Sequence, residues 1–100
     1  MNKPKQPASK RDQAVALRYE HGERAPKIVA SGAGEIARRI IELAKQNEVP
    51  VHRDDSLVEI LAKLKVGSEI PPETYRAVAE ILAFLYRADD DWKRSRTPTR

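Results

Sequence analysis

The sequence predicts an α/β (α+β) domain in which a small mixed three-stranded sheet packs with three helices, in the order β-β-α-β-α-α. Three observations lead to this fold class. Apolar residues alternate along Gln13–Glu20, they recur at helical spacing along three later stretches, and Gly and Pro separate these stretches. The length of 100 residues suits one small domain.

An antiparallel hairpin is expected at the start of this domain. Along Gln13–Glu20 the larger apolar side chains fall on every second residue, which is typical of a half-buried strand. Residues 21–24 are polar or Gly and form the turn. Pro26 can begin a second strand, which runs over Lys27–Ala30, because the first residue of a strand needs no ladder donor.

A helix and a third strand follow the hairpin. The helix is predicted from about Ala33 to Gln46, with Ser31 or Gly32 as its cap. Residues 49–52, Val-Pro-Val-His, have the composition of a short strand, and Pro50 restricts it to the edge of the sheet. The order strand–helix–strand predicts a parallel, right-handed crossover.

Two more helices complete the predicted fold. Asp54, Asp55 and Ser56 each offer a cap for the second helix, and Ser56 with Glu59 fits a capping box. Gly67 ends this helix. The third helix follows Pro71 and Pro72 and continues to Arg87. It carries the longest apolar stripe in the chain, formed by Tyr75, Val78, Ala79, Leu82 and Tyr86, with Ile81 and Leu85 beside it.

The charge is concentrated at the two ends of the chain. The net charge is +4; residues 1–12 hold four cations against one acid, and residues 88–100 hold four cations against three acids. We therefore divide the chain into a disordered basic arm at 1–12, a domain at 13–87 and a charged flexible tail at 88–100. A nucleic-acid-binding module that uses the basic ends is the alternative function, but the nearly neutral body disfavours it. Trp92 either packs back on the last helix or anchors a partner.

The residues give no sign of an enzyme, a cofactor or a metal site. The spacing Gly32-x-Gly34-x-x-Ala37 outlines a dinucleotide-binding fingerprint, but three short strands are too few for that fold, so the two glycines are interpreted as allowing close packing of the helix. There is no phosphate-binding loop and no Cys. No apolar run reaches the length of a membrane span, and we expect a cytoplasmic protein.

Four sequence pieces together resemble one known family. They are AVALRY, APKIVASGAG, the helix end A-K-x-N-E-V-P-V and VGSEIPPETYRAVAEILA, and they occur in this order between Ala14 and about Arg87. This region resembles the cytoplasmic domain of the FlhB/YscU/SpaS family, the export switch of bacterial type III secretion. In that family a membrane domain carries the cytoplasmic domain, and the chain cleaves itself within an Asn-Pro-Thr-His motif before the AVAL strand.

The resemblance implies a function and a binding site, but this chain lacks the family's cleavage motif. Ser9, Lys10, Arg11 and Asp12 stand where the cleavage motif belongs, so we expect a short homologue that neither cleaves itself nor carries a membrane domain. The implied role is an accessory to, or a substitute for, the switch domain of a flagellar or type III export apparatus. The implied partners are apparatus proteins and export substrates, bound by a monomer. The family's substrate-binding positions correspond here to an apolar patch of Ala25, Pro26, Ala79 and Leu82.

Overall fold

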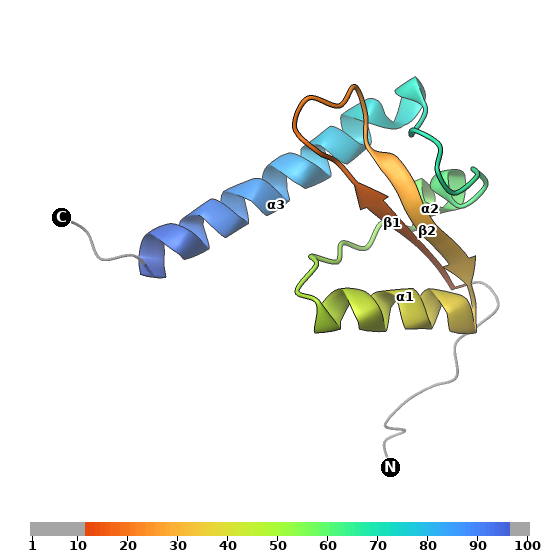
Figure 1. Cartoon of the computed structure of the whole chain (residues 1–100), viewed down its shortest axis with the longest axis horizontal. Coiled ribbons are helices and arrows are strands. Elements are labelled where there is room, and N and C mark those ends of the chain that lie inside the picture. The colour runs from red at the N-terminus through yellow and green to blue at the C-terminus, as the bar shows by residue number, and fades with distance from the viewer. Residues whose placement is uncertain (1–11, 97–100) are drawn as a thin grey trace, which may run out of the picture.

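The computed structural model describes residues 12–96 of the chain, and their side chains as far as Leu85. The elements are β1 (Gln13–Arg18), β2 (Lys27–Ala33), α1 (Glu35–Gln46), α2 (Asp55–Leu61), the short 3₁₀ helix η1 (Pro72–Thr74) and α3 (Tyr75–Arg96). Figure 1 shows α1 and α2 close to the two strands, with α3 crossing the hairpin end of the body. The predicted basic arm, apart from Asp12, lies outside the described residues, as do residues 97–100.

The predicted hairpin is confirmed. β1 and β2 pair antiparallel, from Gln13 opposite Ala33 to Arg18 opposite Lys27, with a register shift between Ala16 and Leu17. The second strand is longer than predicted, because it continues through Ala33. Gly22 has φ 93°, a conformation that favours glycine at the turn.

The prediction of a third strand at residues 49–52 is wrong, and so is the parallel crossover that depended on it. In the described part of the chain the sheet has two strands. Pro50 has no N–H to donate, and the Val49 amide instead donates to the Ala44 carbonyl at 2.8 Å, where it closes the end of α1. Val49 and Val51 are both about half exposed, so little burial favours their addition to the sheet.

A different segment lies along the other edge of β2. Lys27 and Glu69 form an isolated antiparallel bridge. Three backbone hydrogen bonds extend the pairing: the Ile28 amide to the Ser68 carbonyl at 2.9 Å, the Gly67 amide to the Ile28 carbonyl at 2.6 Å and the Ile70 amide to the Pro26 carbonyl at 3.0 Å. The chain after α2 therefore satisfies the backbone groups that β2 would otherwise leave open.

Gly32, near the end of β2, confirms the packing interpretation. A Cβ atom added to Gly32 would collide with the side chain of Ile36, so only glycine lets the first turn of α1 lie this close to the strand. Gly34, with φ 61°, is the residue that caps α1, rather than Ser31 or Gly32. The helix accordingly begins at Glu35, two residues later than predicted.

The core joins the hairpin, α2 and α3. Its buried members are Ala25, Ile28, Leu57, Leu61, Ile70 and Val78, and Ile28 is fully buried at its centre. α2 supplies Leu57 and Leu61 from one face. Among the predicted candidates, Asp54 is the cap of α2: its Oδ1 accepts a hydrogen bond from the Leu57 amide at 3.0 Å. Ser56 lies inside the helix, so the capping box predicted for Ser56 and Glu59 does not form. This helix ends at Leu61, well before Gly67.

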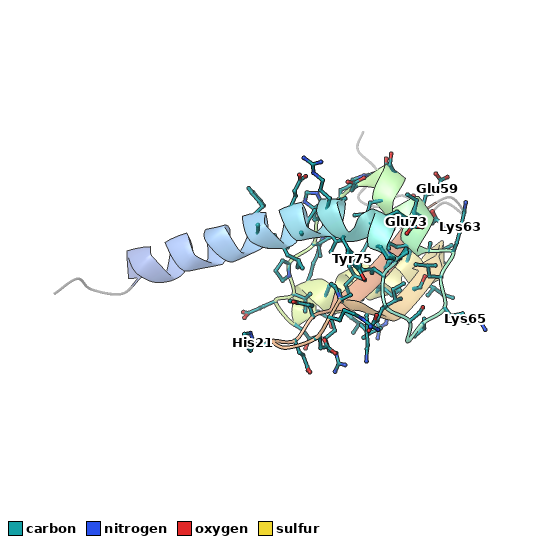
Figure 2. The ribbon with its side chains drawn as sticks, turned by 90° about the horizontal axis from the view of Figure 1, so that it is seen from above. His21, Glu59, Lys63, Lys65, Glu73 and Tyr75 are labelled. Carbon is teal, nitrogen blue, oxygen red and sulfur yellow. The ribbon has the colours of Figure 1, made fainter. Side chains whose placement is uncertain are left out.

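α3 is longer than the sequence predicted. Thr74 precedes it and is buried, with its hydroxyl donating to the Pro71 carbonyl at 2.7 Å. The helix then continues to Arg96, past the predicted end at Arg87, because no Gly or Pro interrupts residues 75–96. Figures 1 and 2 both show α3 extending far from the body. Among the helices that the structure describes, none is long and apolar enough to cross a membrane.

Candidate functional site

The first half of the predicted patch, Ala25 and Pro26, lies where the hairpin loop enters β2. Both residues are buried, and Ala25 is only 2% exposed. Ala25 belongs to the core cluster together with Ile28 and Val78. The pair therefore supports the site from beneath, and its side chains are not accessible to a ligand in this conformation.

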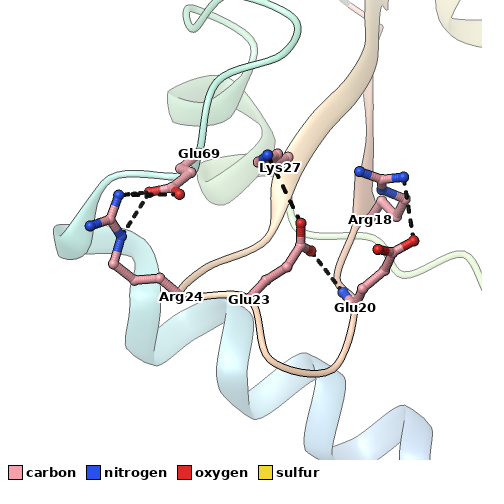
Figure 3. Close-up of polar contacts among 6 residues, drawn as sticks. All are labelled: Arg18, Glu20, Glu23, Arg24, Lys27 and Glu69. Atoms are coloured by element: carbon pink, nitrogen blue, oxygen red, sulfur yellow. Dashed lines mark hydrogen bonds and ion pairs between the residues drawn. The ribbon is translucent and has the colours of Figure 1, made fainter.

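Polar contacts hold this loop in place (Figure 3). The Arg24 guanidinium binds both carboxylate oxygens of Glu69, with Nη2 at 3.1 Å from Oε1 and 3.3 Å from Oε2. On the other side, the Glu20 amide donates to Oε1 of Glu23 at 2.8 Å, and Lys27 pairs with Glu23 at 3.9 Å. These contacts connect the loop to itself and to the segment along β2, so the backbone at Ala25 and Pro26 is fixed from both sides.

The second half of the patch lies on α3. Val78 points into the core, Leu82 is partly buried against the same core cluster, and Ala79 is exposed. Ala79 and Leu82 are three residues apart and therefore neighbours on one helix face. The structure thus brings Ala25 and Leu82 together through the core, with Pro26 next to Ala25 in the chain, and leaves Ala79 on the surface.

Tyr75 extends the accessible part of this surface and was not among the predicted site residues. It is exposed, and it precedes Ala79 by four residues, so the two share a helix face. Figure 2 shows Tyr75 in the first turn of α3, at the end of the helix that packs on the body. Its position in the apolar stripe was visible in the sequence, but the stripe alone could not separate its exposed edge from its buried centre.

The candidate site can bind a ligand only through apolar contacts of its side chains. Ala25, Pro26, Ala79 and Leu82 carry no ionisable or nucleophilic group, so binding here would depend on the burial of a small apolar surface. Within residues 12–96, no group of three or more His, Cys, Asp or Glu side chains is arranged to hold a metal ion. The stripe on α3, formed by exposed Tyr75 and Ala79 and partly buried Leu82, lies beside the hairpin loop and is suited to receiving a short apolar segment.

The chain is similar in sequence to one protein family and to several of its members. The model of the family described as FlhB, HrpN, YscU and SpaS matches residues 11–85. The uncharacterized protein YlqH of Bacillus subtilis is 43% identical over 81 residues, a match that covers 80% of this chain and 87% of YlqH. The flagellar biosynthetic protein FlhB of Aquifex aeolicus is 43% identical over 74 residues, which cover 72% of this chain but only 21% of that protein.

Solved structures show the same fold. The PscU C-terminal domain superposes with a TM-score of 0.70 at 26% identity, and the match covers 74% of this chain and 96% of that domain. An EscU/SpaS C-terminal domain that carries one substitution gives a TM-score of 0.69 at 30% identity, covering 72% of this chain and 89% of that domain. The structural matches therefore cover nearly three quarters of this chain.

Proposed function

Because the chain belongs to the FlhB, HrpN, YscU and SpaS family, we propose that it acts as a non-enzymatic accessory to, or substitute for, the switch domain of a flagellar or type III export apparatus. The proposed partners are export substrates and components of the apparatus, met by a monomer at the cytoplasmic face. The chain matches about a fifth of the length of FlhB, so activities of the whole relative enter only as part of this proposal.

One observation supports substrate binding most directly. An apolar stripe of exposed Tyr75 and Ala79 and partly buried Leu82 lies on α3 beside a hairpin loop that salt bridges and backbone hydrogen bonds hold in place. A preformed apolar surface favours short peptide ligands, because the protein loses little conformational freedom when the ligand binds. In this proposal Ala79 and Leu82 contact the ligand, and Ala25 and Pro26 hold the surface in position.

The chain is also proposed to remain intact. Self-cleavage in the family needs an Asn at the start of the Asn-Pro-Thr-His motif, and here residues 9–12 are Ser-Lys-Arg-Asp. Residues 9–11 lie outside the described part of the chain, whereas the Asp12 carbonyl accepts a hydrogen bond from the Gly34 amide at 2.8 Å. Without the Asn side chain, the cyclisation onto its own carbonyl has no nucleophile, and the protein acts by binding alone.

The test is a titration of the full chain with the N-terminal peptide of an export substrate, followed by calorimetry and by the NMR shifts of backbone amides. We expect a dissociation constant near micromolar, about −8 kcal/mol, with shifts centred on residues 75–82. Ala79→Asp should weaken binding at least tenfold because it places a charge on the apolar stripe. Glu80→Gln, next to it on the helix and exposed, is the matched control. Equal binding by wild type and Ala79→Asp would exclude this surface.

A further inference from the structure

A hollow lies between α2 and the start of α3, away from the apolar stripe of Tyr75, Ala79 and Leu82. It is open to solvent, has a volume of about 190 Å³ and is lined mainly by apolar atoms. Leu57, Ile60 and Ala77 supply the apolar surface. Ile60 is 48% exposed although it is a large aliphatic residue, so the hollow leaves hydrophobic surface in contact with water.

The polar side chain on the floor of this hollow is already hydrogen-bonded within the protein. Thr74, which also lines it, is buried, and its hydroxyl already donates to the Pro71 carbonyl. A cavity of about 150 Å³ accommodates a benzene ring in another protein. The hollow therefore has room for one aliphatic or ring side chain, and an apolar group is what its floor favours.

The rim of the hollow is acidic. Asp54, at the start of α2, and Glu73, just before α3, both line it. Asp54 uses Oδ1 to cap α2, which leaves Oδ2 accessible, and Glu73 forms no ion pair with any described residue. Oδ1 of Asp54 already accepts a hydrogen bond from the Leu57 amide, whereas no described residue forms a hydrogen bond or ion pair with the Glu73 carboxylate, so Glu73 contributes the less compensated negative charge.

Neighbouring charges do not neutralise this rim. Arg53 is paired with Asp55 at 3.3 Å, so its charge is already offset. Glu59, on α2, and Lys63, just after the end of α2, are both exposed and carry opposite charges. Figure 2 shows Glu59 and Glu73 at the end of the molecule where α2 meets the start of α3. The remaining charge around the hollow is that of Asp54 and Glu73.

We propose that this hollow, the α2–α3 pocket, binds a partner segment in which one apolar side chain is flanked by Lys or Arg. The apolar side chain covers Ile60, Leu57 and Ala77, and the flanking cations face Glu73 and Asp54. Charge complementarity selects this partner: an acidic segment would meet two carboxylates, and a purely basic one would leave Ile60 exposed.

The α2–α3 pocket is independent of the proposed substrate surface. At about 100° per residue along a helix, Ala77 and Ala79 point about 160° apart around α3. The two sites are therefore on nearly opposite sides of the helix, and a ligand on one does not cover the other. This inference does not rest on the proposed export function, and either can fail while the other stands.

The experiment titrates the ¹⁵N-labelled full chain with the peptide acetyl-Lys-Leu-Lys-amide and follows backbone amide shifts. We expect weak binding, with a dissociation constant near millimolar and shifts confined to residues 54–60 and 73–77. Glu73→Gln should weaken binding about threefold, in line with the loss of one exposed ion pair. Asp54→Asn keeps the capping oxygen and should weaken binding less. Glu35→Gln, which removes the same charge from α1, is the matched control and should bind as wild type.

Several outcomes would overturn the proposal. Equal shifts with acetyl-Lys-Gly-Lys-amide would show charge attraction without use of the hollow, and equal shifts with acetyl-Glu-Leu-Glu-amide would show that the acidic rim has no role. Shifts of the pocket amides that grow with protein concentration alone would identify a second copy as the occupant. Peptide binding that becomes more than tenfold tighter when residues 1–11 are removed would identify the chain's own basic segment as the occupant.

Discussion

Ala25→Asp is predicted to destabilise the domain strongly, because Ala25 is 2% exposed and lies in the core cluster. The family-matched region, residues 11–85, should have a free energy of unfolding of about 4–11 kcal/mol at 0.05–0.15 kcal/mol per residue. An uncompensated buried carboxylate costs about 3–5 kcal/mol. The substitution should therefore remove between roughly a quarter and all of the stability of the domain.

The assay is urea unfolding followed by circular dichroism, with wild type and Ala79→Asp measured beside it. Ala79 is exposed on α3, so its substitution by Asp should cost only the difference in helix propensity, below about 1 kcal/mol. The pH dependence adds a second check. Burial raises the pKa of the introduced carboxyl above its value of about 3.9 in the unfolded chain, so the difference between Ala25→Asp and wild type should shrink as the pH falls from 7 to 4.

The reasoning would be refuted by an Ala25→Asp protein that unfolds within about 1 kcal/mol of wild type at pH 7 with an unchanged denaturant dependence. That result would mean that Ala25 is accessible to water, and that the hairpin loop forms part of the surface and not its support. Equal, large losses for Ala25→Asp and Ala79→Asp would instead mean that α3 is turned on the body, with Ala79 inside.

Two further predictions concern the packing of α1 and the chemistry before β1. Gly32→Ala should cost about 1–3 kcal/mol because its methyl group would collide with Cγ2 and Cβ of Ile36. In an Ile36→Ala background the Cγ2 contact is gone but Cβ remains 2.8 Å from the added methyl group, so the same change should cost less without becoming neutral. Additive losses in this double-mutant cycle would contradict the close approach. The intact mass of the purified chain should not change during prolonged incubation at neutral and alkaline pH, and a specific cut near residues 9–13 in protease-free protein would disprove the absence of self-cleavage.

The sequence was sufficient where a local signal decides the structure. Alternating apolar residues and Pro26 predicted the hairpin, and helical periodicity predicted that α1, α2 and α3 are helices. The sequence was insufficient where two segments could each pair with the free edge of β2. Residues 49–52 have a strand-like composition, but residues 67–70, which contain Gly, Ser and Glu and show no alternation, pair with β2 instead.

The candidate site shows the same limit. Ala79 and Leu82 could be placed on one helix face from their spacing, but their exposure depends on the angle at which the hairpin loop crosses α3, which is a tertiary property. Ala25 and Pro26 read as surface residues of a loop, yet the Arg24–Glu69 pair and the Pro26–Ile70 hydrogen bond enclose them. The α2–α3 pocket had no sequence signal, because Ile60 fits a core position and Glu73 an ordinary helix start.

The most direct test of the central claim compares two ligands on the full chain: an export-substrate N-terminal peptide and a short DNA duplex, each titrated at low and at physiological salt. The account predicts peptide binding near micromolar that changes little with salt, since the stripe of Tyr75, Ala79 and Leu82 is apolar. Any duplex binding should fall steeply with salt, because it would depend on phosphate contacts from Lys and Arg. Tight, salt-resistant duplex binding together with no detectable peptide binding would contradict the account.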